Sequence, residues 1–310
     1  MLSRVFAIAM NTYREAVRAR ILIGLLALAL AASTYSLVIA AMSVRQEMRI
    51  VADIGAGSIS LFAVAVSIFL GASSLYRELE FKTVFPILTR RLRRHEYIVG
   101  KYLGIMITVF AFIAIDGGAV LAILALQAKQ HVELTIGVIV GMLALLGVLV
   151  WRAKLTRVFV FLPWSLLFFV AMAALADATG GERQIVVYSC LLTLAEVGII
   201  TAVAMVFSSF SSPFLTAIFT MWIFLIGRSS DTLGNLPERI FGSAVRTTGM
   251  VLAKIVPNLN VYVPARPLLL GQISTTAPAL YISHAWLNAV FYAVVLLTLS
   301  AFVFRRRDFQ

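Results

Sequence analysis

Long runs of apolar residues, separated by short polar segments, follow one another along most of the chain. A helix that crosses the hydrocarbon core of a bilayer needs about 20 mainly apolar residues. Eight runs approach this length, at residues 21–42, 54–75, 102–126, 134–150, 158–176, 185–208, 214–227 and 285–304. The runs at 134–150 and 214–227 are short; either could extend into its flanks, and 214–227 could instead be part of a broken helix. The pattern predicts an all-α fold in which residues 1–310 form a single transmembrane domain, a polytopic membrane helix bundle of about eight transmembrane helices.

The segment 2–20, before the first apolar run, has polar and apolar residues on opposite faces of a helix. Arg4, Arg14 and Arg18 share one face, and Phe6 and Tyr13 lie on the other, at 100° per residue. Helices of this kind lie in the plane of the membrane interface. We therefore expect an N-terminal amphipathic helix on the inner leaflet, joined directly to the first span.

The composition excludes an ordinary soluble domain. Hydrophobic residues make up 61% of the chain and charged residues only 13%, whereas soluble domains are about 45–50% apolar. With the N-terminus in the cytoplasm, 17 of the 26 lysines and arginines fall in the predicted inner segments. This distribution follows the positive-inside rule and, with eight spans, places both termini in the cytoplasm.

The net charge of +12 indicates contact with anionic lipid headgroups,. We expect no nucleic acid partner, because the basic residues do not form a stripe with interleaved aromatic side chains.

Three polar segments between the spans have distinct patterns. Residues 76–101 form a long inner segment in which Pro86 should separate two short helices below the membrane,. Residues 228–284 form an extracytoplasmic segment with five of the eight prolines. It contains a predicted amphipathic helix at 238–256 on the outer surface and a stretch, 261–270, that returns into the protein. Residues 208–213 predict a tight inner turn.

The chain lacks the residues of an enzyme or of a metal site. Gly100-Lys101 is followed by Tyr102, and no glycine-rich loop precedes it, so it does not form a Walker A phosphate site,. The three histidines fall in different segments, and Cys190 is the only cysteine,. We expect no catalytic residues, no metal and no cofactor bound by this chain.

Two acidic residues lie inside predicted spans, Asp116 in the third and Glu196 in the sixth. Ionisable groups at this depth are rare and often line a transport pathway, so both are candidates for the substrate pathway or for a proton-linked site. A hydrogen-bonded pair that fixes helix packing, or a neutral carboxyl group, would also explain them. No basic residue at the centre of a span offers either one a partner. Gly117-Gly118 should let a neighbouring helix approach closely.

Four stretches resemble the permeases of ABC transporters of the ABC-2 type, and the resemblance covers most of the chain. It is closest to the permeases of nitrous-oxide-reductase maturation and gliding-motility systems. The stretches are Asn11-Thr12 with Arg14-Glu15, the run Arg77-Glu78-Leu79-Glu80-Phe81-Lys82-Thr83 with Gly100-Lys101-Tyr102, the turn from Phe207 to Pro213, and the ending Phe304-Arg305-Arg306-Arg307. The chain departs from the family in lacking a proline near Arg91 and in having eight spans. The extra pair of spans follows the third one, around residues 151–157, and adds to a six-span core.

The resemblance implies a transmembrane permease subunit of an ATP-driven exporter in the cytoplasmic (inner) membrane of a bacterium. Two copies of an ABC ATP-binding subunit would bind ATP and Mg, and a second permease copy would complete a homodimer. In this family the segment after the second span is the coupling helix, which contacts the ATP-binding subunit. The matching residues are Arg77, Glu78, Glu80, Lys82 and Thr83.

Two other functions fit the pattern. The chain could be a secondary transporter or channel driven by an ion gradient, with Asp116 and Glu196 as coupling sites, although we find no inverted repeat of the kind common in that class. It could also be a membrane anchor for a soluble complex, because the inner segment 76–101 is long enough to bind one.

Overall fold

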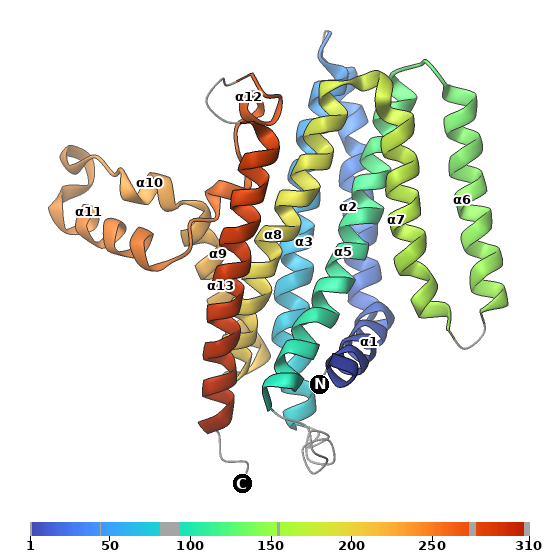
Figure 1. The fold of residues 1–310 in the computed structure, drawn as a ribbon. Helices are drawn as coiled ribbons and strands as arrows, with labels where there is room; N and C mark the ends of the chain where they lie inside the picture. Colours follow the sequence, from blue (N-terminus) through green and yellow to red (C-terminus); the bar gives the residue numbers. More distant parts are fainter. Residues whose placement is uncertain (1, 44, 81–93, 154–155, 273–276, 307–310) are drawn as a thin grey trace.

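The computed structural model describes residues 2–43, 45–80, 94–153, 156–272 and 277–306, and Figure 1 shows them as a bundle of long helices. These residues contain helices, turns and no strand. Within them, seven helices are long and apolar enough to cross a membrane: α2 (Arg20–Ala41), α3 (Glu47–Glu80), α5 (Arg94–Gln127), α6 (Val132–Arg152), α7 (Arg157–Leu175), α8 (Gly181–Ser208) and α13 (Pro278–Arg306). The predicted all-α polytopic membrane bundle is confirmed at this level.

Helices α3, α5 and α8 form the centre of the bundle. Most residues of their apolar stretches are buried, whereas α2, α6, α7 and α13 expose most of theirs. The exposed side chains include large apolar ones such as Trp151, Leu287 and Phe291. So large an exposed apolar surface is matched to lipid chains.

Helix α1 (Leu2–Arg18) lies obliquely across the lower end of the bundle in Figure 1. Ala9, Tyr13 and Ala16 are buried, and the helix packs mainly against α5. Ala19, with an extended backbone (φ −69°, ψ 121°), then turns the chain into α2. The predicted amphipathic helix is therefore present. Phe6, which was expected on its apolar face, is exposed and does not pack into the bundle.

The expected seventh span is interrupted. Helix α9 (Pro213–Arg228) has 16 residues, about 24 Å, and is shorter than the about 30 Å hydrocarbon core. The chain then leaves the bundle as α10 (Ser230–Gly234) and α11 (Glu238–Ile255), which project from its side in Figure 1. It returns at Leu259, whose backbone N–H donates to the Gly227 carbonyl at the end of α9 (3.0 Å). From there η2 (Asn260–Tyr262) and α12 (Arg266–Leu269) lead to the upper end of the bundle.

The short connections around α9 follow the sequence closely. Helix α8 ends at Ser208 and α9 begins at Pro213, with Ser212 as its N-cap, so the predicted tight turn is present. Helix α11 spans the predicted range but is interrupted at Gly242, whose backbone is not helical (φ 79°, ψ 163°). It ends just before Pro257, as expected from the restriction that proline places on the preceding residue,. Leu259, Tyr262 and Leu269 are buried, so the predicted return of the chain into the protein is also present.

The inner segment 76–101 is helical at both described ends. Helix α3 continues to Glu80 and α5 begins at Arg94, so the predicted second and third spans are each part of a 34-residue helix, about 51 Å long,. Residues 81–93, where two short helices were predicted, lie outside the described residues. Helices α3 and α5 are thus long enough to extend well beyond a hydrocarbon core of about 30 Å.

Helices α6 and α7 form a pair at one side of the bundle in Figure 1. The indole N–H of Trp164 in α7 donates to the Met142 carbonyl in α6 (2.8 Å), and Trp164 stacks on Phe168. Helix α7 packs against α5, while α6 has few other contacts. This pair corresponds to the two spans predicted on either side of residues 151–157.

Candidate intramembrane polar site

Glu196 is fully buried near the middle of α8. It lies about 18 Å from the lower end of this helix, which is close to the centre of a hydrocarbon core about 30 Å thick. Its Oε1 is 3.0 Å from Nη1 of Arg228, the last residue of α9. The two atoms are at ion-pair distance, but their angles fall outside hydrogen-bond geometry.

Ser60 of α3 joins this ion pair. Arg228 Nη2 donates to Ser60 Oγ (2.9 Å), and Ser60 Oγ donates to Glu196 Oε2 (3.3 Å). Three helices, α3, α8 and α9, therefore meet at one polar site at membrane depth. Glu196 is 0% exposed, whereas Arg228 is 27% exposed, so the site is accessible from the arginine side.

The expectation that no basic residue pairs with Glu196 was wrong. Arg228 follows the seventh apolar run directly, and a continuous span would have placed it at the outer membrane surface. Because α9 is only 16 residues long and the chain breaks there, Arg228 instead lies at the depth of Glu196. The shortness of the seventh apolar run and the proline-rich segment that follows it were the sequence signals for such a break,.

Tyr262 of η2 lies close to this site on the far side of the break. Its hydroxyl donates to the Ala285 carbonyl of α13 (3.3 Å). This hydrogen bond holds the returning chain against α13.

Asp116 of α5 is also fully buried, but its surroundings differ from those of Glu196. Ser33 Oγ of α2 donates to Asp116 Oδ1 (3.0 Å), and the Ser33 and Ser58 hydroxyls are 3.0 Å apart. Oδ2 has no hydrogen-bond partner among the described residues. Within the same residues no lysine, arginine or histidine forms an ion pair with Asp116.

Helix α3 separates the two acidic residues. Ser58 and Ser60 are two positions apart, which places them about 200° apart on the helix surface. Ser58 faces α2 and the Asp116 side, and Ser60 faces α8 and the Glu196 side. The structure therefore does not bring Asp116 and Glu196 into one site. Ser60 contacts Glu196 directly, whereas Ser58 is linked to Asp116 only through Ser33 of α2.

The close approach predicted at Gly117-Gly118 is present. A Cβ atom at Gly117 would lie 2.7 Å from the Cys190 sulfur of α8, and one at Gly118 would lie 2.6 Å from the Phe168 ring of α7. Both contacts are too short for a larger residue, so α5 packs tightly against α7 and α8 next to Asp116. Cys190 itself is a buried free thiol.

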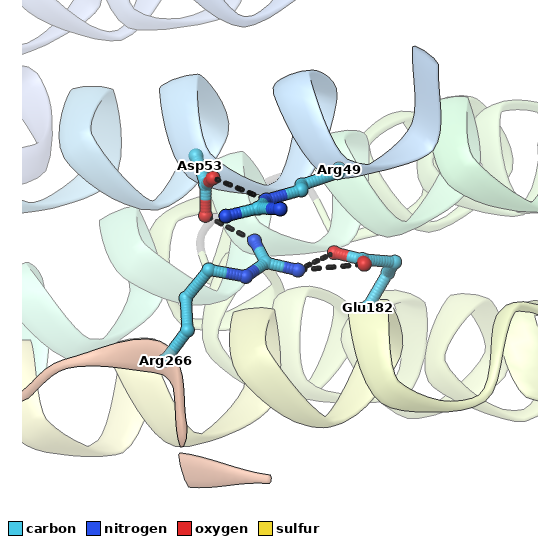
Figure 2. Close-up of polar contacts among 4 residues, drawn as sticks. All are labelled: Arg49, Asp53, Glu182 and Arg266. Carbon is cyan, nitrogen blue, oxygen red and sulfur yellow. Dashed lines mark hydrogen bonds and ion pairs between the residues drawn. The ribbon is translucent and has the colours of Figure 1, made fainter. Parts of the chain in front are cut away.

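A second polar cluster lies near the upper end of the bundle and is shown in Figure 2. Arg266 of α12 contacts Asp53 of α3 and donates to both carboxylate oxygens of Glu182 in α8 (2.6 Å each). Nε of Arg49 lies 3.9 Å from Oδ2 of the same Asp53. Burial disfavours the charged guanidinium, but its hydrogen bonds to Glu182 and Asp53 outweigh this and raise the pKa of Arg266. The cluster ties the segment after the break to α3 and α8.

The residues that the resemblance assigns to ATPase coupling lie at the opposite end. Arg77, Glu78 and Glu80 are in the last turns of α3. Lys82 and Thr83 lie outside the described residues. Glu80 is 20 residues from Ser60 along one continuous helix, a distance of about 30 Å. Helix α3 thus connects the predicted coupling residues to both buried carboxyl groups.

Helix α1 is fastened to this end of the bundle by a buried lysine. Lys101 of α5, only 2% exposed, lies 4.0 Å from the Glu15 carboxylate of α1 and donates to the Ser74 carbonyl of α3 (3.3 Å). Tyr13 donates to the Val158 carbonyl of α7 (3.0 Å), and its burial raises its pKa to about 12. These contacts join α1 to α3, α5 and α7.

The described residues contain no group of three or more histidine, cysteine, aspartate or glutamate side chains that could hold a metal ion. The arrangement offers charged and hydroxyl groups at membrane depth, which suits binding and movement of a solute.

No protein-family model matches the sequence, and a search of curated proteins finds no match to it.

Proposed function

We propose that this chain is the transmembrane permease subunit of an ATP-driven ABC exporter in a bacterial inner membrane. A separate ATP-binding subunit, present in two copies, binds ATP and Mg below the membrane. Two copies of this chain form the pathway. The resemblance of the sequence to ABC-2 permeases is the origin of the proposal, and the geometry of α3 is the observation that supports it best.

Helix α3 is suited to transmit force from the inner end to the centre of the membrane. It is continuous from Glu47 to Glu80, and it makes extensive contacts with α8, α2 and α5. A push on the turn at Arg77 and Glu78 would therefore move Ser58 and Ser60, and with them the hydrogen bonds to both carboxyl sites. Transport driven by closure of an ATPase requires this kind of two-state helix bundle.

The interrupted α9 also favours a transport protein. Non-helical backbone at membrane depth is tolerated where protein covers it or where it lines a cavity. Here it is combined with the ion pair of Glu196 and Arg228, and charged groups at this depth commonly mark a substrate path,. Arg228, which is partly exposed, is the residue of this site that a passing substrate reaches first.

Photocrosslinking in the native host tests the proposal. A photoreactive amino acid at position 82 or 83 should crosslink the chain to an ATP-binding protein. The same amino acid at position 46 or 129, in the connections at the other end of the bundle, should not. Mass spectrometry identifies the partner. Crosslinks at 82 and 83 that contain no ATP-binding protein would contradict the proposal.

A charge-reversal pair provides the matched control. Glu78→Lys together with Glu80→Lys should reduce co-purification of the ATP-binding subunit at least tenfold, because the change reverses two charges at the proposed contact. Glu47→Lys changes the same residue type at the opposite, exposed end of α3 and should leave co-purification unchanged. Equal retention in both variants would mean that α3 does not contact the ATPase.

One observation favours a second candidate, a transporter driven by an ion gradient. Asp116 is a buried carboxyl group without a basic partner among the described residues, as is common at ion-coupling sites,. In this alternative Asp116 and Glu196 bind the coupling ion. Gradient-driven uptake into liposomes that contain this chain alone, without ATP, would favour it; no uptake under these conditions would count against it.

A further inference from the structure

Glu196 and Asp116 are both buried carboxyl groups, but their surroundings differ in how far they compensate a negative charge. Glu196 has a guanidinium 3.0 Å away and a serine hydroxyl donor, so its negative charge is compensated. Asp116 has one hydroxyl donor, Ser33, and no cationic side chain in the described part of the chain. An uncompensated carboxylate in an apolar interior is strongly disfavoured and is normally neutralised.

We propose that Asp116 is a proton-binding site: its carboxyl group holds one proton on Oδ2 in this packed state, while Glu196 stays ionised. This inference does not depend on the proposed function, since it concerns the packing of α2, α3 and α5.

The hydrogen bonds around Asp116 assign the proton to one oxygen. Oδ1 accepts from Ser33, as the carbonyl oxygen of a neutral acid does. Oδ2 is buried and has no partner among the described residues, which is far less unfavourable for a neutral O–H group than for an anionic oxygen,. A bound cation would need several oxygen ligands, and the described contacts supply only this carboxyl and the Ser33 and Ser58 hydroxyls,.

The surrounding helices supply no charge to Asp116. Helix α2 presents Ser33 and α3 presents Ser58. From α8 the nearest titratable group is the Cys190 thiol, which contacts Gly117, and α7 presents the rings of Phe168 and Phe169 to the adjacent glycines. Neutral groups therefore surround the site on each side for which the structure describes contacts.

Helix α2 covers one side of this site. It exposes most of its surface, and its buried positions are small residues, Ala29, Ser33, Ser36 and Ala40. If a rearrangement of α2 against α3 and α5 admits water to Asp116, the carboxyl O–H can release its proton to that water. The site therefore holds a proton in this packed state and releases it only to water that reaches the carboxyl group.

Infrared spectroscopy of the full chain in lipid nanodiscs tests this inference directly. A neutral carboxyl group has a C=O stretching band that a carboxylate lacks. We expect such a band at neutral pH, lost in Asp116→Asn and retained in Glu196→Gln. The asparagine variant keeps the acceptor for Ser33 and should unfold at the wild-type temperature.

Isotope labelling of the wild type makes the test independent of any variant. The chain has five aspartates. Asp53, Asp177 and Asp231 have exposed side chains with polar partners, and Asp308 lies outside the described residues. Asp116 is thus the one buried aspartate among the described residues, and aspartate labelled with ¹³C in its carboxyl group should shift the band. Absence of a shifted band at neutral pH, or its appearance only in sodium-free buffer, would overturn the proposal.

Discussion

The ion pair between Glu196 and Arg228 joins the middle of α8 to the last residue of α9, a contact that the sequence pattern does not predict. Glu196 is fully buried and Arg228 is mostly buried, so water does little to stabilise either charge. Each charge is instead stabilised by the opposite charge of its partner. Removing one partner of a buried pair leaves an uncompensated charge, which is usually more destabilising than replacing both. The pair therefore holds the broken end of α9 against α8.

We expect Arg228→Ala to lower the free energy of unfolding by about 3–5 kcal/mol, because Glu196 is then buried alone. The double change Arg228→Leu with Glu196→Leu should be less destabilising than Arg228→Ala. Unfolding with a denaturing detergent, followed by circular dichroism, measures both. A double variant that is less stable than Arg228→Ala would show that Arg228 does not compensate the buried charge of Glu196.

The stabilisation from the polar cluster around Arg266 should depend on salt concentration, whereas that from the Glu196–Arg228 pair should not. Arg266 is 18% exposed, and Asp53 is 44% exposed, so solvent ions reach the contact. We expect Arg266→Ala to cost about 1 kcal/mol at low salt, as for exposed pairs. The difference from wild type should nearly vanish at about 1 M salt. The effect of Arg228→Ala should persist at both salt concentrations.

At the scale of elements, α1 is held against α5 by close backbone contact. A Cβ atom at Gly104 would lie 2.5 Å from the Ala9 carbonyl oxygen, which belongs to the backbone of α1 and cannot rotate away. Glycine at this position therefore lets α1 lie directly on α5. Lys101 and Glu15 add a charged contact at the same junction.

Gly104→Ala should separate α1 from α5 and destabilise the protein by about 1–3 kcal/mol, as overpacked sites do. Gly141→Ala in α6 is the matched control. A Cβ there meets nothing within 4 Å, and alanine favours a helix over glycine by up to about 1 kcal/mol. Thermal unfolding in detergent compares the two. Equal effects of both changes would mean that α1 does not pack as described.

The helices themselves could be predicted from the sequence because apolar length and proline positions determine them locally. The 2–20 helix and the turn at 208–213 formed within a residue or two of the predicted ends. The predicted helix at 238–256 spans 238–255 but is interrupted at Gly242, whose backbone is not helical. The interruption of α9 was indicated only by the shortness of the run 214–227 and by the prolines after it, which do not place it at a residue. Its position depends on the contact of Leu259 with Gly227, which is a tertiary interaction.

The candidate site was predicted in part, for the same reason. Asp116 and Glu196 stand out in any apolar run, so both were found from the sequence. Ser33, Ser58, Ser60 and Arg228, which distinguish the two sites, were not found. Serine is common in membrane helices, and only packing shows which hydroxyls reach a carboxyl group. Helix periodicity says which residues share a face, but not which helix lies opposite that face.

At the scale of the whole molecule, α3 links the polar sites described above. Its lower end contains Arg77, Glu78 and Glu80, its middle contains Ser58 and Ser60, and its upper end contains Asp53, which contacts Arg266. The described chain begins with α1 and ends with α13, and both of these ends lie at the lower end of the bundle in Figure 1. Under the proposed function, a force applied at this end would act through α3 on the interior polar sites and on the cluster around Arg266.

Purification of the chain from its native host in mild detergent, with assay of ATP hydrolysis, tests the central proposal most directly. We predict an ATP-binding subunit that co-elutes in a one-to-one ratio with this chain, and ATP hydrolysis by the purified complex. A chain that elutes alone, in a stable folded state and without ATP hydrolysis, would contradict the proposal and favour a transporter driven by an ion gradient.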